Sequence, residues 1–208
     1  MIPRVHLISD ARAPLGILGS IERALRAELP EPIAVHLRHQ ADDRELYRLG
    51  LELRALTRER GALLFINRRL DLALALGADG LHLPERGLLA HEARTLWGPR
   101  LIGVSRHDDR GILQGSQGAD YAFLSPVAQV PGKNAPIGAA RLLEIAARSP
   151  LPIVALGGLD AALLAQLRSD RPKNPAGVHG FAAMRSILHA DEPDQALLSL
   201  YRVFIGSV

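Results

Sequence analysis

The sequence alternates eight short apolar runs with segments of helical periodicity over almost its whole length. Most of these runs are apolar at consecutive positions, without the alternation of a strand that has one face in water. Continuous apolar runs are typical of parallel strands that are covered on both faces. The runs lie at residues 5–9, 33–38, 63–67, 80–82, 101–105, 121–125, 153–156 and 178–182. Their order predicts repeated strand–helix units with right-handed crossovers.

The segments between the runs carry the signals of amphipathic helices. Leucines recur at helical spacing after Asp42 and again after Asp160, and both aspartates are suitable N-caps. The helical periodicity of the segment after Ser105 is weaker, because Gly111 interrupts it. A last helix is predicted over residues 194–204.

A short internal repeat helps to choose between the two folds that such units can form. Gly77-Ala78-Asp79-Gly80 and Gly118-Ala119-Asp120-Tyr121 each end a helix with a glycine and begin the next run. Glycine can take the left-handed conformation that turns the chain from a helix into a strand. An open doubly wound sheet is the alternative, but no glycine-rich dinucleotide motif follows the first run. We therefore predict a single (β/α)8 TIM barrel domain over residues 1–208.

Composition and charge narrow the class of protein. The 208 residues include no cysteine, which excludes disulfides and thiolate chemistry. The net charge of +3 comes from arginines scattered among acids, with Lys133 and Lys173 as the two lysines, and aromatic residues are few. A nucleic-acid-binding protein would concentrate its cations and aromatic residues, so no nucleic-acid partner is expected. No apolar run is long enough to cross a membrane and the first residues lack a signal-peptide layout, so we predict a cytoplasmic protein.

In a (β/α)8 barrel the functional side chains lie at the carboxyl ends of the strands. Polar residues gather at these ends in this sequence, which predicts a polar, partly cationic pocket for a small anionic ligand. A zinc site would need His36, His39 and His82 to converge, which their spacing does not predict. No functional role is predicted for His6. The candidate binding residues are His36, Arg38, Gln40, Asn67, Ser105, Lys133, Gly157, Gly158, Met184 and Arg185, and the candidate catalytic residue is His107.

Two of these segments predict a phosphate site. Gly157-Gly158 directly follows the seventh run, where the absence of side chains lets a ligand approach the backbone. The turn at residues 183–186 leads into a short helix after the eighth run. Loops seven and eight of these barrels often bind phosphate. A tight turn with no ligand is the alternative interpretation of Gly157-Gly158.

Several motifs, taken together and in order, resemble the thiamine phosphate synthase/TenI superfamily. They are Val35-His36-Leu37-Arg38, Phe65-Ile66-Asn67, Leu72 to Leu83 with its Gly80-Leu81-His82-Leu83 end, Ile102 to His107, Gly118-Ala119-Asp120-Tyr121, Ser125-Pro126-Val127, Lys133 and Ala155 to Leu159. The resemblance covers nearly the whole chain. It implies a (β/α)8 barrel that handles a thiazole phosphate, and often an aminopyrimidine pyrophosphate, in thiamine biosynthesis.

The resemblance breaks down where the synthases bind magnesium and pyrophosphate. Gln40 stands where the family has a lysine, and Arg68 stands where it has a metal-binding aspartate. The second metal-binding aspartate falls near Gly87, and the threonines before the family's lysine correspond to Val130 and Gly132. Magnesium prefers carboxylate oxygens, so no metal or other cofactor is predicted unless the synthase alternative holds. A variant in which Arg68 replaces the charge of the metal is left open.

Three hypotheses for the function follow from this resemblance. The first is a TenI-like thiazole tautomerase that binds a thiazole phosphate and uses His107 as its acid/base group. The alternative is a thiamine phosphate synthase with an altered diphosphate site. The second alternative is a non-catalytic TenI-like binding or regulatory protein. The expected partner is the small-molecule thiazole phosphate, and a homodimer is compatible with the sequence.

Overall fold

Eight parallel strands close into a barrel in the order in which they occur along the chain. The computed structural model describes residues 1–133, 135–169 and 178–206. All eight predicted strands are present, and the prediction of a single (β/α)8 barrel is confirmed. The strands are β1 (Val5–Ile8), β2 (Ala34–Leu37), β3 (Leu63–Asn67), β4 (Gly80–Leu83), β5 (Leu101–Arg106), β6 (Tyr121–Leu124), β7 (Ile153–Leu156) and β8 (Val178–Ala183).

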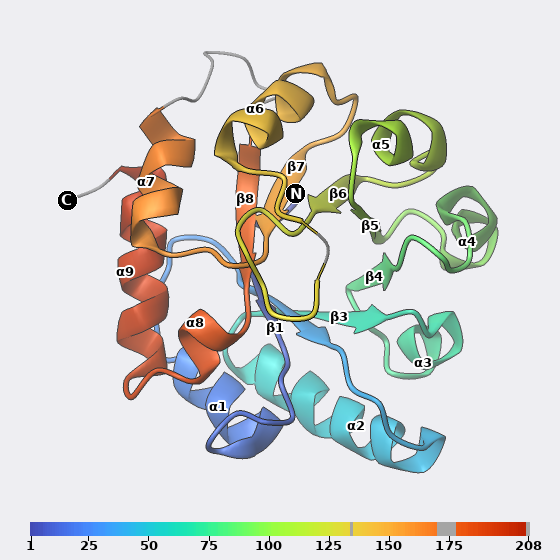
Figure 1. Ribbon diagram of the computed structural model, residues 1–208. Helices are drawn as coiled ribbons and strands as arrows, with labels where there is room; N and C mark the ends of the chain where they lie inside the picture. The colour runs from blue at the N-terminus through green and yellow to red at the C-terminus, as the bar shows by residue number, and fades with distance from the viewer. Residues whose placement is uncertain (134, 170–177, 207–208) are drawn as a thin grey trace.

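Helices surround the strands, and a helix follows each of the eight strands (Figure 1). The C-terminal helix α9 packs beside α7 and α1 and completes the outer layer. The helices are α1 (Gly16–Ala24), α2 (Asp43–Glu59), α3 (Leu70–Ala75), α4 (Ala90–Trp97), α5 (Asp109–Gly115), α6 (Ala139–Arg148), α7 (Ala161–Ser169), α8 (Arg185–Leu188) and α9 (Pro193–Ile205). In the described part of the chain, no helix is both long and apolar enough to cross a membrane.

The predicted helix starts are confirmed at two aspartates. The Asp42 carboxylate accepts a hydrogen bond from the backbone N–H of Glu45 at 2.9 Å, which caps α2. The Asp160 carboxylate accepts one from the backbone N–H of Leu163 at 2.8 Å at the start of α7. Each cap pairs a backbone donor that has no partner within the helix. These two caps fix the residues at which α2 and α7 begin.

The strands are apolar on both faces because two separate apolar layers cover them. The larger layer lies between the sheet and the ring of helices. The smaller layer fills the inside of the barrel and includes Ile8, Phe65, Tyr121 and Phe123. Alternate residues of each strand point into the barrel, so the continuous apolar runs of the sequence reflect burial from both sides.

Glycines on two strands make room for the aromatic rings inside the barrel. A Cβ atom at Gly80 would lie 2.0 Å from the Phe65 ring, and one at Gly103 would lie 2.3 Å from the Tyr121 ring. Contacts this short are not possible between packed atoms, so both positions require glycine. Small residues on β4 and β5 thus balance large ones on β3 and β6, as the layered packing of these barrels demands.

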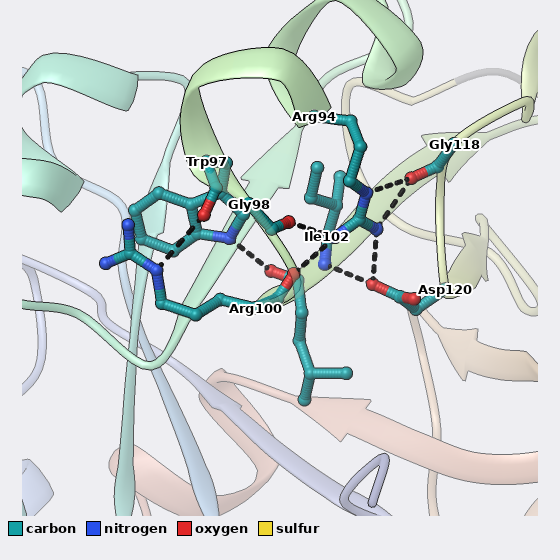
Figure 2. Close-up of polar contacts among 8 residues, drawn as sticks. Arg94, Trp97, Gly98, Arg100, Ile102, Gly118 and Asp120 are labelled. Carbon is teal, nitrogen blue, oxygen red and sulfur yellow. Dashed lines mark hydrogen bonds and ion pairs between the residues drawn. The ribbon is translucent and has the colours of Figure 1, made fainter.

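The aspartates of the repeated Gly-Ala-Asp segments accept hydrogen bonds that connect neighbouring elements at the amino end of the barrel. We call the network around Asp120 the latch. The Asp120 carboxylate accepts hydrogen bonds from the backbone N–H of Ile102 at 2.7 Å and from the Arg94 guanidinium at 2.8 Å. Arg94 also donates to backbone carbonyls, among them that of Gly118, and so ties α4 to the starts of β5 and β6 (Figure 2). The Asp79 carboxylate accepts the equivalent bonds two strand–helix units earlier, from the N–H of Leu64 and from Arg54.

Replacing Asp120 by alanine is expected to lower the free energy of unfolding by about 2–3 kcal/mol. The substitution leaves the N–H of Ile102 and the guanidinium of Arg94 without their acceptor, and partly buried donors are costly to leave unpaired. Urea denaturation measures the change. Glu52→Ala, which removes an exposed pair with Arg48, is the control and should cost less than about 0.5 kcal/mol. An Asp120→Ala protein as stable as this control would contradict the role of the latch.

Candidate functional site

A cavity of about 400 Å³ opens at the carboxyl ends of the strands. Its volume lies within the usual range for small-molecule sites. The predicted site residues that line it are His36, Arg38, Asn67, Ser105, His107, Lys133, Gly157, Gly158, Met184 and Arg185. Gln40 is the exception, because it is exposed in the loop after β2 and does not line the cavity. The structure thus brings the other candidates together, and their binding roles stay predictions.

The floor of the cavity is formed by rings that are almost completely buried. His36 and His82 are 2% and 3% exposed, and both lie close to the Phe123 ring. His36 stacks on Phe65 with a centroid separation of 4.8 Å. Burial lowers the pKa of His82 to about 3, and burial lowers the pKa of His36 well below its ordinary value. Both rings are therefore neutral near pH 7, and the floor carries no charge.

His107 stands at the rim of the cavity, directly after β5. Its Nδ1 lies 2.5 Å from the backbone carbonyl oxygen of Ser125. A carbonyl can only accept, so Nδ1 carries the hydrogen and Nε2 is the atom free to exchange a proton. The Glu85 carboxylate lies 3.9 Å from Nε2, which is too long for a hydrogen bond but within ion-pair distance. The side chain is 43% exposed and so can meet a ligand.

The charged side chains of the cavity lining are mostly cations. Arg38 and Lys133 come from the loops after β2 and β6, and Arg185 is the first residue of α8, which follows β8. Glu85 is the one carboxylate among the described residues that line the cavity. The predicted partly cationic character is therefore present at the rim, while the floor is neutral. Such an arrangement suits a ligand with an anionic group near the opening and an uncharged body below it.

Gly157 and Gly158 join the loop after β7 to the loop that carries Lys133. Both glycines have positive φ values, 97° and 68°. A Cβ atom at Gly158 would lie 2.8 Å from the side chain of Ala128, and the N–H of Ala128 donates to the carbonyl of Gly157 at 3.0 Å. The glycines are thus required by the backbone itself. This supports the tight-turn interpretation, and a phosphate contact at the same place stays a prediction.

The segment after β8 is held against β1 by a buried aspartate. The Asp10 carboxylate, 6% exposed, accepts a hydrogen bond from Nε2 of His189 at 3.0 Å, just beyond α8. Its other oxygen accepts from the backbone N–H of Arg12. Burial raises the pKa of Asp10, but the hydrogen bonds from Arg12 and His189 outweigh it, and the pKa lies below its ordinary value. The hydrogen bonds to Asp10 hold the turn at Met184 and Arg185 over the cavity.

The residues present do not fit a magnesium site. Arg68 and Gly87, at the positions where the resemblance implies aspartates, offer no metal ligand, and neither lines the cavity. Within the described ranges, no group of three or more histidine, aspartate or glutamate side chains could hold a metal ion. Arg68 has a φ of 68°, the left-handed region that asparagine, aspartate and glycine occupy more readily than arginine. Arg68 is exposed and is not among the residues that line the cavity, and a role of its guanidinium in place of a metal's charge stays a prediction.

Sequence reasoning missed the parts that three groups play in the site. His6 lies beneath the floor, the Ser125 carbonyl fixes the tautomer of His107, and Glu85 faces His107. The alternation of inward-facing residues along β1 could have placed His6 inside the barrel. A backbone carbonyl that acts as a partner leaves no signal in the sequence.

The fold and the cavity define a class, the (β/α)8 barrels that carry a cavity with a cationic rim at the carboxyl ends of their strands. Within this class, the sequence pattern of the family described as thiamine monophosphate synthase (TMP-TENI) matches residues 5–187. The chain belongs to the thiamine monophosphate synthase/TenI family.

Individual relatives agree with this assignment. The chain is 33% identical to a thiamine-phosphate synthase of Salinispora arenicola over 201 residues, which cover 93% of each chain. It is 35% identical to a thiamine-phosphate synthase of Desulfitobacterium hafniense, over 95% of this chain and 97% of the relative. Among solved structures, thiamine phosphate pyrophosphorylase from Pyrococcus furiosus superposes with a TM-score of 0.83 at 28% identity, covering 98% and 96% of the two chains. A 3-hexulose-6-phosphate synthase, at 15% identity and a TM-score of 0.67, shares the fold.

Proposed function

We propose that the cavity binds a thiazole phosphate and that the protein isomerises the thiazole by proton transfer through His107. The observation that carries this proposal is the combination of a free Nε2 on His107 with a rim of three cations and, among the residues that the structure describes, no cluster of three or more side chains that could hold a metal ion. The family supplies the ligand class, since its members act on thiamine precursors. The departures at Arg68 and Gly87 favour a reaction that needs no divalent metal.

The proposed reaction assigns each group a separate task. Lys133 and Arg185 bind the phosphate at the rim by charge-assisted hydrogen bonds. Nε2 of His107 takes a proton from one carbon of the carboxythiazole ring and returns a proton to another atom of the ring system, which leaves the aromatic tautomer. Nδ1 keeps its hydrogen on the Ser125 carbonyl throughout, and the Glu85 carboxylate stabilises the imidazolium that forms between the two transfers. No proton is gained or lost overall.

The test is to incubate the protein with the non-aromatic carboxythiazole phosphate in the presence of EDTA and follow aromatisation by ultraviolet absorbance. The proposal expects turnover above the uncatalysed rate that is insensitive to EDTA. A rate equal to that of buffer would overturn it. Adding magnesium should leave the rate unchanged.

The similarity to proteins named thiamine-phosphate synthase favours a second candidate function. In that reaction a thiazole phosphate and an aminopyrimidine pyrophosphate are joined with loss of pyrophosphate. Arg38, Asn67, Ser105 and Lys133 are present at positions that match the family and line the cavity. Measuring pyrophosphate release from the two substrates with and without magnesium decides between the candidates. Magnesium-dependent release would establish the synthase and contradict the isomerase.

Replacing Lys133 by alanine is expected to weaken binding of the thiazole phosphate roughly 10- to 100-fold. The lysine lines the cavity beside the loop of Gly157 and Gly158, and the loss of one charge-assisted hydrogen bond to a phosphate is worth this much. Isothermal titration calorimetry measures the dissociation constant. Arg48→Ala removes an exposed cation on α2, outside the cavity, and should leave binding unchanged. Equal affinities for the two variants would contradict the assignment of the phosphate subsite.

A further inference from the structure

A histidine that does not reach the cavity is hydrogen-bonded to one that forms its floor. His6, on β1, is completely buried among the rings of His36, Tyr121 and Phe123. Its Nδ1 lies 2.9 Å from Nε2 of His36, and its Nε2 lies 3.0 Å from the backbone carbonyl oxygen of Pro3. His36 lines the cavity, whereas His6 lies one layer deeper in the barrel. The two rings therefore connect the cavity floor to a fixed acceptor in the N-terminal segment.

The direction of every hydrogen bond in this chain follows from that acceptor. The Pro3 carbonyl can only accept, so Nε2 of His6 donates to it. A neutral imidazole carries one hydrogen, so Nδ1 of His6 is an acceptor and Nε2 of His36 is the donor. Because His36 is neutral as well, its Nδ1 holds a lone pair. Within the described part of the chain no hydrogen-bond partner of this Nδ1 is seen.

Neutrality of both rings has a physical basis. Their neighbours are aromatic rings and aliphatic side chains, and burial lowers the pKa of His6 to about 3. Among the described residues, His82, the other histidine of the floor, has no contact of the kind that the Pro3 carbonyl makes with His6. Its Nε2 lies 2.9 Å from the Ser105 hydroxyl, which can donate or accept, so that contact fixes no tautomer.

We propose that His6 is a positioning residue that locks the tautomer of His36, and that Nδ1 of His36 accepts a hydrogen bond from a donor group at the inner end of the ligand. A ligand with an N–H or O–H group there is selected, and one with a carboxylate or another pure acceptor is rejected. The inference rests on the proposed function in one respect, that the cavity binds the ligand with its phosphate at the rim. It fits the synthase candidate directly, because the amino group of the aminopyrimidine is a donor. For the isomerase candidate it requires that the carboxylate of the carboxythiazole lies away from Nδ1 of His36.

The tautomer can be tested without any ligand. In protein labelled with ¹⁵N at the histidine rings, NMR distinguishes protonated from unprotonated ring nitrogens. The expected result for His36 is a protonated Nε2 and an unprotonated Nδ1. In His6→Phe, which keeps a ring but removes the acceptor, His36 should populate both tautomers. A wild-type spectrum with a protonated Nδ1 of His36 overturns the inference, and this measurement requires no variant to fold.

The selection for a donor can be tested with three matched probes. These are phenyl phosphate, 4-aminophenyl phosphate and 4-carboxyphenyl phosphate, which differ at the end opposite the phosphate. The amino compound is expected to bind the wild-type protein roughly 3- to 10-fold more tightly than phenyl phosphate, the effect of one hydrogen bond, and the carboxy compound more weakly. In His36→Phe the amino and phenyl compounds should bind equally.

The possible outcomes separate the two proposals. Tightest binding by the carboxy compound, or an amino preference that persists in His36→Phe, overturns the role of His36. Failure of all three probes to bind overturns the proposed phosphate site, while the NMR spectrum still decides the tautomer. His91→Gln, which changes an exposed histidine on α4, should alter neither measurement.

Discussion

Lowering the pH from 7 to 5 is expected to reduce the free energy of unfolding by about 4 kcal/mol through two buried histidines. Burial lowers the pKa of His6 and His82 to about 3 in the folded protein, whereas a histidine in the unfolded chain titrates near 6.5. Below about pH 6.5 the unfolded state therefore binds more protons than the folded state, and stability falls with pH until about pH 3. Each ring contributes about 2 kcal/mol at pH 5. His36 acts in the same direction.

A loss of this size is comparable to the whole stability of many domains, so acid unfolding should occur near pH 5. Urea denaturation at intervals between pH 4.5 and 7.5 measures the slope. Asp71 does not contribute in this window. Its hydrogen bond from Arg69 lowers its pKa to about 2, and the stability that it provides is lost below about pH 4. His6→Phe should flatten the slope and His91→Gln should not. A stability that is constant from pH 7 to 5 would show that the buried rings accept protons in the folded state.

Replacing His107 by glutamine is expected to lower the rate of thiazole isomerisation by roughly 10²- to 10⁴-fold, the usual contribution of a general acid/base. Glutamine can still donate to the Ser125 carbonyl but cannot exchange a proton. Binding of the thiazole phosphate should change by less than about 3-fold, since the phosphate contacts lie on other loops. Rates under saturating substrate and calorimetric binding, measured on the same preparation, separate the two effects.

His39 offers a matched control for this variant. It lies outside the cavity, where its Nε2 is 3.7 Å from the Glu45 carboxylate, much as His107 faces Glu85. His39→Gln should retain the full rate. A His107→Gln protein with an unchanged rate would remove His107 from the reaction, whether or not the thiazole phosphate still binds.

The barrel could be predicted from the sequence because its strands are apolar on both faces and its turns carry their own signals. The Gly-Ala-Asp repeat predicted the turns into β4 and β6, and Gly77 and Gly118 do have positive φ values, 57° and 83°. Because the strands are buried on both faces, the residues that face the inside of the barrel could not be predicted. Alternation is lost when both faces are apolar, so no sequence pattern indicated the pairing between Gly80 and Phe65.

The rim of the cavity was predictable and its inner contacts were not. Candidate residues were chosen at the ends of strands, where topology alone brings them together. Gln40, which follows the last residue of β2 by three positions, lies outside the cavity because the loop has already turned away. The partners of His107 and His36 could not be predicted, since one is a backbone carbonyl and the other a histidine thirty residues away in sequence.

The backbone at Arg68 suits a different side chain better than arginine. Its left-handed φ of 68° and the hydrogen bond from its N–H to the carbonyl of His82 hold a turn that an acidic or amide residue would occupy with less strain. The conformation of this turn therefore does not depend on the arginine side chain. Replacing Arg68 by aspartate would place a carboxylate next to Asn67 with one substitution and no movement of the main chain.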